Sequence, residues 1–306
     1  ILKDTFPMIF ITNYFDTYPH TNICAFSDDM NEHTAPHPDQ STVLTISQRA
    51  KGVPWRLGLA HARAQHMLIW VTRGAAHCTV NAQSSAISSH NALFVPAGTL
   101  FSFTYESSCF GQTVALPPSD RLDWPDEPML LRVRESKAQL TLTHYVEAIQ
   151  SEAYDAKPLS RTAAQAHAQL MMVWAHRYLM SQHAAFDKAA QRLMRAFCSL
   201  IVQSEAQDTE GGTMADFAAK LGVTPTHLAR VCKATCGVSA ADLLTQHSLQ
   251  RARRLLEDEG LKAVDIAKRL GFSTPAYFTR FVKSHTGETP STLRTKAKAQ
   301  RQQNQM

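Results

Sequence analysis

The chain has 306 residues, long enough for two domains, of which 44% are hydrophobic and 19% charged, a balance typical of globular proteins. No run of about 18 apolar residues occurs, so the sequence predicts no membrane-spanning helix. Positive charge is concentrated in the C-terminal third. From residue 211 onward there are 15 Lys and Arg and 7 Asp and Glu, a net charge of +8. Because the whole chain carries a net charge of +5, residues 1–210 carry −3.

The cysteines show no paired spacing and the N-terminus no signal-peptide pattern, which predicts a cytoplasmic protein with free thiols. The sequence begins at Ile1 rather than at Met, which leaves open a segment before it.

Short segments typical of β-strands dominate residues 1–130. The runs 66–72, 77–82, 92–98 and 100–106 are rich in β-branched and aromatic residues, and Gly, Ser, Asn or Pro bound them. An Arg-Gly turn at 73–74 predicts that the second run returns along the first. A Pro-Ala-Gly turn at 96–98 separates the next two predicted strands. This pattern resembles a cupin-type sensory barrel.

The metal-ligand pattern of that family is mostly missing. His66 occupies one ligand position, but Ala64 stands at its partner position, no Glu follows before the turn, and Phe101 stands where the last His would lie. One ligand of four does not hold iron or zinc. We therefore predict no metal, no cofactor and no enzyme activity; a metal site would need His61 and His77 instead.

Without a metal, the predicted barrel interior is apolar and aromatic. We expect it to enclose a small organic effector, with an aromatic acid as the first guess, between aromatic walls and a few polar groups. The alternative is that the aromatic side chains only fill the core. The predicted effector-binding residues are Arg56, His66, Trp70, Phe94, Phe101 and Phe103.

Residues 137–206 have helical periodicity. Apolar residues recur on one face of each of two helices: Leu170, Met171, Trp174 and Tyr178 in the first, then Leu193, Met194, Phe197, Leu200 and Ile201 in the second. These faces predict either a homodimer interface or an intramolecular bundle. The stretch 205–213, with Gly211 and Gly212, reads as an interdomain linker.

Two similar stretches follow, at 217–237 and 266–287. Aligning Gly222 with Gly271 gives an offset of 49 residues, and one extra residue in the second copy aligns the later basic positions. Each copy reads as a short helix, a glycine turn and a second helix. Thr224 and Ser273 are the predicted N-caps, with Pro275 at the second position of its helix.

Two helix-turn-helix units with basic outer faces are typical of proteins that bind DNA in the major groove. The alternative is two ordinary helical hairpins with solvated charges. The helix expected between the copies would set the separation of their second helices, which successive major grooves require to be about 34 Å. We expect the last residues, 294–306, to form a solvated and disordered basic tail. The predicted DNA contacts are Thr226, His227, Arg230, Lys233, Thr274, Ala276, Tyr277, Arg280 and Lys283.

Residues 213–294 resemble the DNA-binding domain of the AraC/XylS family of bacterial transcription regulators. The departures are Val282, where an aromatic residue is usual, and His247, where an Arg is usual; the second leaves a salt bridge or phosphate contact in doubt. The cupin resemblance fits the sensory barrels fused to such regulators, particularly the PobR-like subgroup. The matching positions are Ile266, Ala267, Leu270, Gly271, Phe272, Tyr277, Phe278, Arg280, Lys283, Gly287, Pro290 and Arg294.

We therefore predict a two-domain α+β protein: a cupin-like β-barrel at 1–136, a helical dimerisation segment at 137–206, and an all-α tandem helix-turn-helix domain at 207–306. The resemblance implies a ligand-responsive transcription regulator, an activator, with double-stranded DNA, a small-molecule effector, RNA polymerase and a second copy of the chain as partners. The alternatives are a constitutive regulator with a structural barrel and a metal cupin enzyme with a DNA-binding module.

Overall fold

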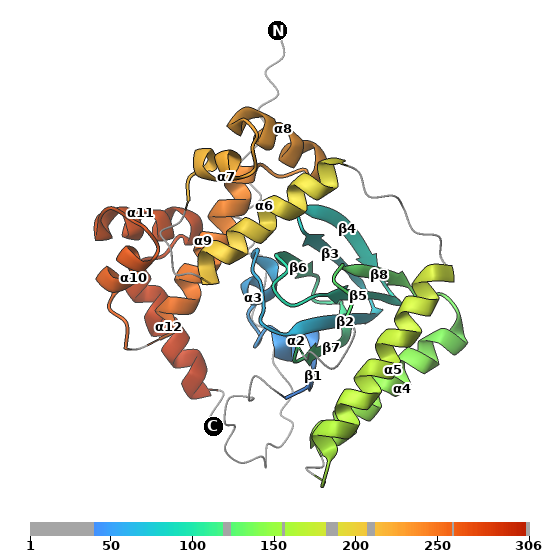
Figure 1. Cartoon of the computed structure of the whole chain (residues 1–306). Helices are drawn as coiled ribbons and strands as arrows, with labels where there is room; N and C mark the ends of the chain where they lie inside the picture. Colours follow the sequence, from blue (N-terminus) through green and yellow to red (C-terminus); the bar gives the residue numbers. More distant parts are fainter. Residues whose placement is uncertain are drawn as a thin grey trace. The chain divides into compact units, whose positions relative to one another are not determined.

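A computed structural model of the chain describes residues 40–118, 124–154, 157–181, 189–206, 212–258 and 260–303 (Figure 1). They form an α+β protein with a sheet-containing N-terminal part and a helical C-terminal part. The contacts divide into two compact units at Gln250 and Arg251, inside the helix α9 (Ala240–Leu256). The first helix-turn-helix thus groups with the sheets, and the predicted domain limits stay a prediction. None of the described helices is long and apolar enough to cross a membrane.

The strands form two antiparallel sheets. The five-stranded sheet has the order β1-β7-β2-β5-β8, and the three-stranded sheet has the order β4-β3-β6. Their bounds are β1 Thr42–Thr45, β2 His66–Arg73, β3 Ala75–Val80, β4 Gln83–Ser88, β5 Asn91–Val95, β6 Phe101–Tyr105, β7 Phe110–Leu116 and β8 Met129–Arg132. Two short helices, α2 (Ile46–Arg49) and α3 (Trp55–Gly58), follow β1.

The predicted return of β3 along β2 is wrong, although the strands themselves are present. β2 pairs with β5 and β7, whereas β3 pairs with β4 and β6, so the turn at Gly74 carries the chain from one sheet to the other. Gly74 has φ +92°, and a Cβ there would lie 2.6 Å from the Ser108 carbonyl oxygen, so only glycine fits this corner. The turn at 96–98 likewise joins β5 to β6 in different sheets. The described strands therefore form two sheets and not the closed barrel that we predicted.

The two faces of the five-stranded sheet enter different cores, because side chains alternate along each strand. From β2, Met67 and Ile69 enter the core that also holds Phe101 and Phe103 of the three-stranded sheet. Leu68 and Trp70 enter the core on the other face. Two long helices cover that second face: α4 (Ser136–Tyr154) and α5 (Ser160–Ser181), which lie side by side (Figure 1).

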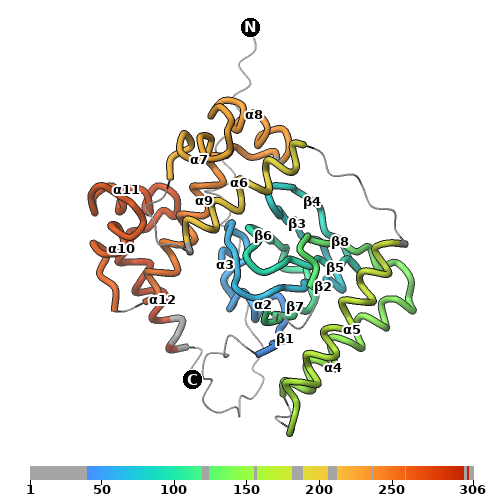
Figure 2. Tube along the Cα trace, in the orientation of Figure 1, coloured from blue at the N-terminus to red at the C-terminus, as the bar shows by residue number. Residues whose placement is uncertain are grey.

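The helix α6 (Ala189–Ala206) belongs to a different core. Its buried residues Met194, Phe197 and Ile201 pack with residues of the first helix-turn-helix, beside which it runs in Figure 2. The Phe197 and Phe217 rings meet edge to face, with centroids 5.5 Å apart. This apolar face is therefore covered within the chain, as the bundle alternative predicted for this helix.

The basic C-terminal segment is helical over its described part, so the predicted disorder is wrong there. Helix α12 (Pro290–Gln303) begins with Pro at its first turn, and the Thr289 hydroxyl accepts a hydrogen bond from the Thr292 N–H at 3.3 Å. Its Ala, Lys, Gln and Arg residues are good helix formers. Arg294 anchors it by donating hydrogen bonds to the carbonyls of Leu256 at 3.4 Å and Leu261 at 2.5 Å.

Candidate nucleic-acid interface

The first helix-turn-helix consists of α7 (Met214–Lys220) and α8 (Pro225–Cys236). Thr213 and Asp216 form a capping box at the start of α7, and hydrogen bonds from Thr213 lower the pKa of Asp216. Gly222, at φ +66°, turns the chain after α7. The Thr224 hydroxyl then accepts the His227 N–H at 3.2 Å and caps α8.

The second helix-turn-helix repeats this design with α10 (Ala263–Arg269) and α11 (Pro275–Thr286). Its cap is Thr274, whose hydroxyl accepts the Tyr277 N–H at 3.3 Å. Pro275 thus takes the first helical position, and the predictions of Ser273 as cap and Pro275 in second place were off by one residue. The extra residue of the second copy lies in the turn between Gly271 and this cap. Aligning Gly222 with Gly271 did not show where in the second copy this residue lies.

Both recognition helices, α8 and α11, have the same length and the same ending. Each spans 12 residues and stops at a glycine in the left-handed region, Gly237 at φ +72° and Gly287 at φ +74°. Each buries a pair of side chains against the helix before it: Leu228 and Cys232 in α8, Phe278 and Val282 in α11. The opposite face of each helix is left to solvent.

That solvent face holds the predicted DNA contacts. His227 is half-buried, and the other eight residues of the set are exposed. In each helix the third residue carries a ring that meets the Arg three positions later: Arg230 Nη2 lies 3.3 Å from His227 Nδ1, and the Arg280 guanidinium lies 5.2 Å from the Tyr277 ring centroid. The two helices therefore present equivalent ring and guanidinium pairs.

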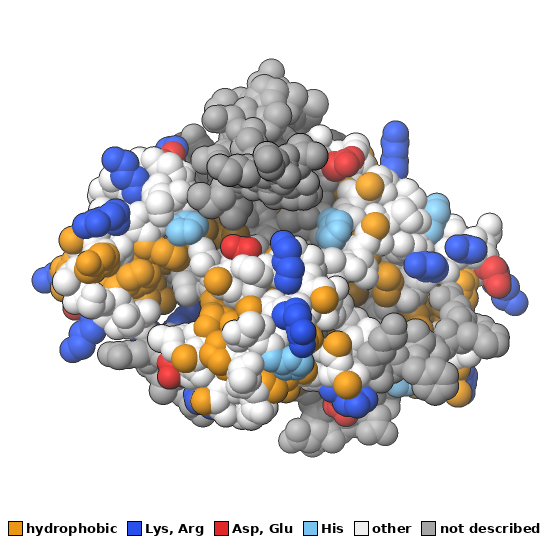
Figure 3. All heavy atoms as spheres, turned by 90° about the horizontal axis from the view of Figure 1, so that it is seen from above, with side chains coloured by type: hydrophobic (Ala, Val, Ile, Leu, Met, Phe, Trp, Pro, Cys, Tyr) orange, Lys and Arg blue, Asp and Glu red, His pale blue; other side chains and the backbone are white. Residues whose placement is uncertain are grey.

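The lysines at the far ends of these faces differ in their contacts. Lys233 Nζ donates to the Gly237 carbonyl oxygen at 2.9 Å, near the end of α8. Lys283 is exposed near the end of α11. Lys and Arg side chains are also spread over the face seen in Figure 3. These cations are available for phosphates.

Other basic residues of this part of the chain are turned inward. His247 is 4% exposed, and its Nε2 lies 3.4 Å from Glu205 Oε2 of α6, so it faces an internal carboxylate and not a phosphate. Arg251 and Arg253 are each 8% exposed. Burial lowers the pKa of Arg253 to about 10, while the nearby Glu288 and Glu257 carboxylates raise it. The count of positive charges therefore overstates the DNA-facing charge.

The predicted effector-binding residues do not share one cavity. Trp70 and Phe94 lie in the core under α4 and α5, whereas Phe101 and Phe103 lie between the sheets. Arg56 lies on α3, its guanidinium 5.1 Å from the centroid of the Trp55 ring. The prediction of a common lining is wrong because Trp70 and Phe94 point to the face of the five-stranded sheet that α4 and α5 cover, whereas β6 packs on its opposite face.

His66 packs on the α4 and α5 side, where its ring stacks on Phe94 and Trp124 at centroid distances of 5.8 and 4.8 Å. Its Nδ1 accepts the Ala97 N–H at 3.1 Å, which fixes the neutral tautomer with the proton on Nε2. Burial lowers the pKa of His66. His66 is thus a neutral packing residue. Across the described residues, no three His, Cys, Asp or Glu side chains are grouped so that they could hold a metal ion.

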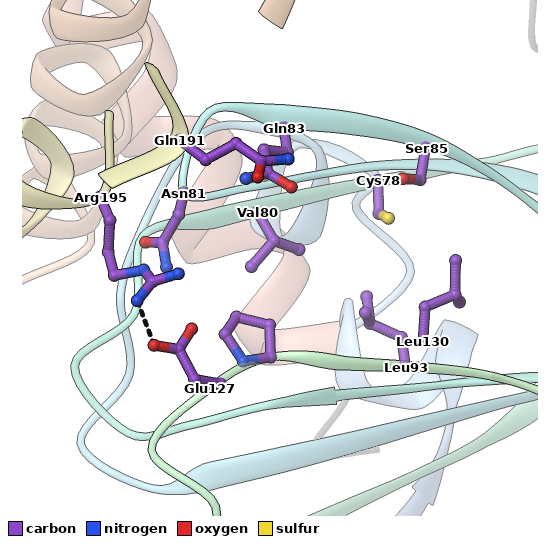
Figure 4. Close-up of a pocket in the computed structure, with 11 residues that line it drawn as sticks. Cys78, Val80, Asn81, Gln83, Ser85, Leu93, Glu127, Leu130, Gln191 and Arg195 are labelled. Atoms are coloured by element: carbon purple, nitrogen blue, oxygen red, sulfur yellow. Dashed lines mark hydrogen bonds and ion pairs between the residues drawn. The ribbon is translucent and has the colours of Figure 1, made fainter. Parts of the chain in front are cut away.

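A cavity of about 290 Å³ lies elsewhere, between the sheets' strands β3, β4, β5 and β8 and the helix α6 (Figure 4). Sequence reasoning missed it, because its charged residues Glu127 and Arg195 are 68 positions apart. No local signal marks these two positions, since Glu127 follows Asp126 and Arg195 follows Arg192 by three residues. The residues that line it are Cys78, Val80, Asn81, Gln83, Ser85, Leu93, Glu127, Pro128, Leu130, Gln191 and Arg195.

Replacing either cap threonine, Thr224 or Thr274, by alanine should cost about 1 kcal/mol of unfolding free energy, because the N–H at the third helical position loses its acceptor. Urea unfolding of the full chain measures this loss. The Thr→Ser variants keep the hydroxyl and serve as controls. Equal stabilities of the Ala and Ser variants would contradict the capping role.

The comparisons with known proteins agree with this geometry. A family model described as a helix-turn-helix domain matches residues 217–296. The probable transcription factor PqrA of Proteus vulgaris is 31% identical over 93 residues, which are 30% of this chain and 76% of PqrA. The HTH-type transcriptional regulator GlxA of Rhizobium meliloti is 37% identical over 76 residues, 25% of this chain and 24% of GlxA.

Solved structures are also similar to the chain. ToxT of Vibrio cholerae, solved with a bound unsaturated fatty acid, has a TM-score of 0.42 at 13% identity, over 87% of this chain and 97% of ToxT. The C-terminal domain of AraT from Geobacillus stearothermophilus has a TM-score of 0.31 at 28% identity, over 36% of this chain and 86% of that domain.

Proposed function

Because the chain belongs to the AraC family of DNA-binding transcription regulators, we propose that α8 and α11 both read bases in the major groove of its operator. The observation that supports this most is the repeated geometry of the two recognition helices. Each presents a short polar face that begins at a threonine cap and carries a ring and an Arg three residues apart. A face of this size and chemistry fits the major groove.

The proposed contacts divide into two kinds. Arg230 and Arg280 donate to base edges, since Arg is the residue most often found on guanine, and their ring partners hold the guanidinium groups. Lys233 and Lys283 neutralise phosphates, which positions the helices without reading sequence. The remaining proposed contacts, at the N-terminal turns of the helices, are Thr226 and His227 in α8 and Thr274, Ala276 and Tyr277 in α11.

Selection of sequences by the full chain from a pool of random DNA duplexes tests this function. The proposal expects one enriched motif with two parts, one for each recognition helix. Binding without any enriched motif would overturn it.

The lysines give a separate expected result. Lys233→Ala and Lys283→Ala should each weaken binding to all sequences alike and reduce the slope of log K against log salt by about 1, because one phosphate contact is lost. Titration of the motif and of a scrambled duplex at several salt concentrations measures this. Lys51→Ala, an exposed change in the sheet-containing part, is the control. A slope unchanged in both α8 and α11 variants would contradict the phosphate role.

The control of this regulator is also part of the proposal. A small organic acid binds the sheet-containing part and thereby changes transcription. The proposed effect is activation, through contact with RNA polymerase. The proposed location of the protein is the cytoplasm. A homodimer is supported by three exposed apolar side chains on α5: Leu170, Val173 and Met180 are 54%, 40% and 81% exposed. They share one face of the helix with Arg177. The alternative of a constitutive regulator would apply if no small molecule binds the chain.

A further inference from the structure

The cavity beside α6 has two kinds of wall. Its floor is apolar: Cys78, Val80 and Leu93 are 2%, 7% and 3% exposed, and they belong to the core between the sheets. Its other walls carry amide and hydroxyl groups of Asn81, Gln83, Ser85 and Gln191. At about 290 Å³ it has the size of a small ligand site. Such walls suit a small molecule with an apolar body and a polar end.

An ion pair stands at one end of this cavity. Arg195 of α6 and Glu127, which precedes β8, face each other in Figure 4, and their side chains are 36% and 53% exposed. A pair this exposed adds little stability. The planar guanidinium of Arg195 can bind a carboxylate through two parallel hydrogen bonds. Replacing the Glu127 carboxylate by that of a ligand therefore changes the free energy of this ion pair little.

We propose that this cavity binds a small organic carboxylate that takes the place of Glu127 on Arg195, while its apolar body covers Val80 and Leu93. The inference rests on the proposed response to an organic acid and names the site and the chemical class. It differs from the aromatic set expected from the sequence, none of which lines this cavity.

The same helix connects the cavity to the DNA-reading part. Arg195 lies between Met194 and Phe197, whose side chains are fully buried in the core with Phe217 of α7 and Leu228 of α8. The ion pair with Glu127 is a link between this helix and the segment before β8. A carboxylate that displaces Glu127 breaks that link, and α6 passes the change to the first recognition helix.

The test uses the full chain with sodium benzoate, phenylacetate and octanoate as probes and benzamide as the neutral counterpart of benzoate. The carboxylates should raise the unfolding temperature with concentration, because they bind the folded state, and benzamide should not. Arg195→Gln should weaken binding about tenfold or more, since a charge-assisted pair is lost. Glu127→Gln should tighten it, because the internal competitor is gone.

The Arg195→Gln and Glu127→Gln variants are matched, because each breaks the same ion pair. Any loss of stability that comes from breaking this pair is therefore common to both variants. Binding of an anion at Arg195 predicts opposite changes in affinity, whereas a shared loss of stability predicts changes in the same direction. Arg192→Gln, the same substitution at an exposed position of α6 outside the cavity, should leave affinity unchanged. Affinity that changes in the same direction in both variants, an equal response to benzamide, or no response to any of the three carboxylates would overturn the proposal.

DNA binding by the same protein preparations separates the two proposals. Protein that selects a DNA motif but binds no carboxylate overturns the cavity assignment alone. Protein that binds carboxylates but selects no DNA motif overturns the proposed function. Bound carboxylate is expected to change the affinity for the motif in the wild type and not in Arg195→Gln.

Discussion

Replacing Phe197 by alanine should destabilise the first helix-turn-helix by about 3–5 kcal/mol, the usual loss for a buried aromatic side chain. Phe197 is fully buried and meets Phe217 edge to face, although it lies before the segment 217–296 that the family model matches. Hydrogen exchange should rise in α7 and α8, and affinity for the DNA motif should fall with it.

The control for this change is Leu140→Ala on α4, whose side chain is 70% exposed and should change stability by about 0.5 kcal/mol or less. Exchange in α7 and α8 that stays at the wild-type level in Phe197→Ala would show that α6 does not support the recognition helix. It would also remove the route from the cavity to DNA.

Arg230→Ala and Arg280→Ala should each cost about 1–3 kcal/mol of binding free energy at the selected motif, and the double variant about 2–6 kcal/mol if the two contacts are independent. Because the two arginines lie on different helices, we expect the two losses of binding free energy to be independent. Binding titrations at one fixed salt concentration measure the three losses. Arg134→Ala, an exposed change outside the recognition helices, should bind as the wild type does.

A loss of less than about 0.5 kcal/mol in the double variant would contradict the assignment of both arginines, because it falls below the smallest value expected for one base contact. A loss confined to one of them would leave a single base-reading helix.

Local signals explain why the helix-turn-helix units were predictable. Glycine turns, threonine caps and proline at the first helical position act within a few residues, and they placed α7, α8, α10 and α11 nearly as the structure has them. The single error, Ser273 in place of Thr274, arose because two adjacent hydroxyl residues both precede Pro275 and either one can cap a helix.

Long-range contacts explain what the sequence did not reveal. The pairing of β2 with β5 and β7 depends on the glycine corner at Gly74 and on helices that cover the second face of the sheet, and no local pattern encodes either. The departure at His247 left a salt bridge or a phosphate contact in doubt, and only the fold brings Glu205 beside it. The cavity likewise depends on Glu127 and Arg195, which only the fold brings together.

A DNA selection repeated with the wild type, Arg230→Ala and Arg280→Ala chains shows whether both recognition helices read bases through one arginine each. Each variant should lose preference at its own base pair, in a different part of the motif, and keep the rest. Motifs from both variants that are identical to the wild-type motif would contradict base reading by the two arginines.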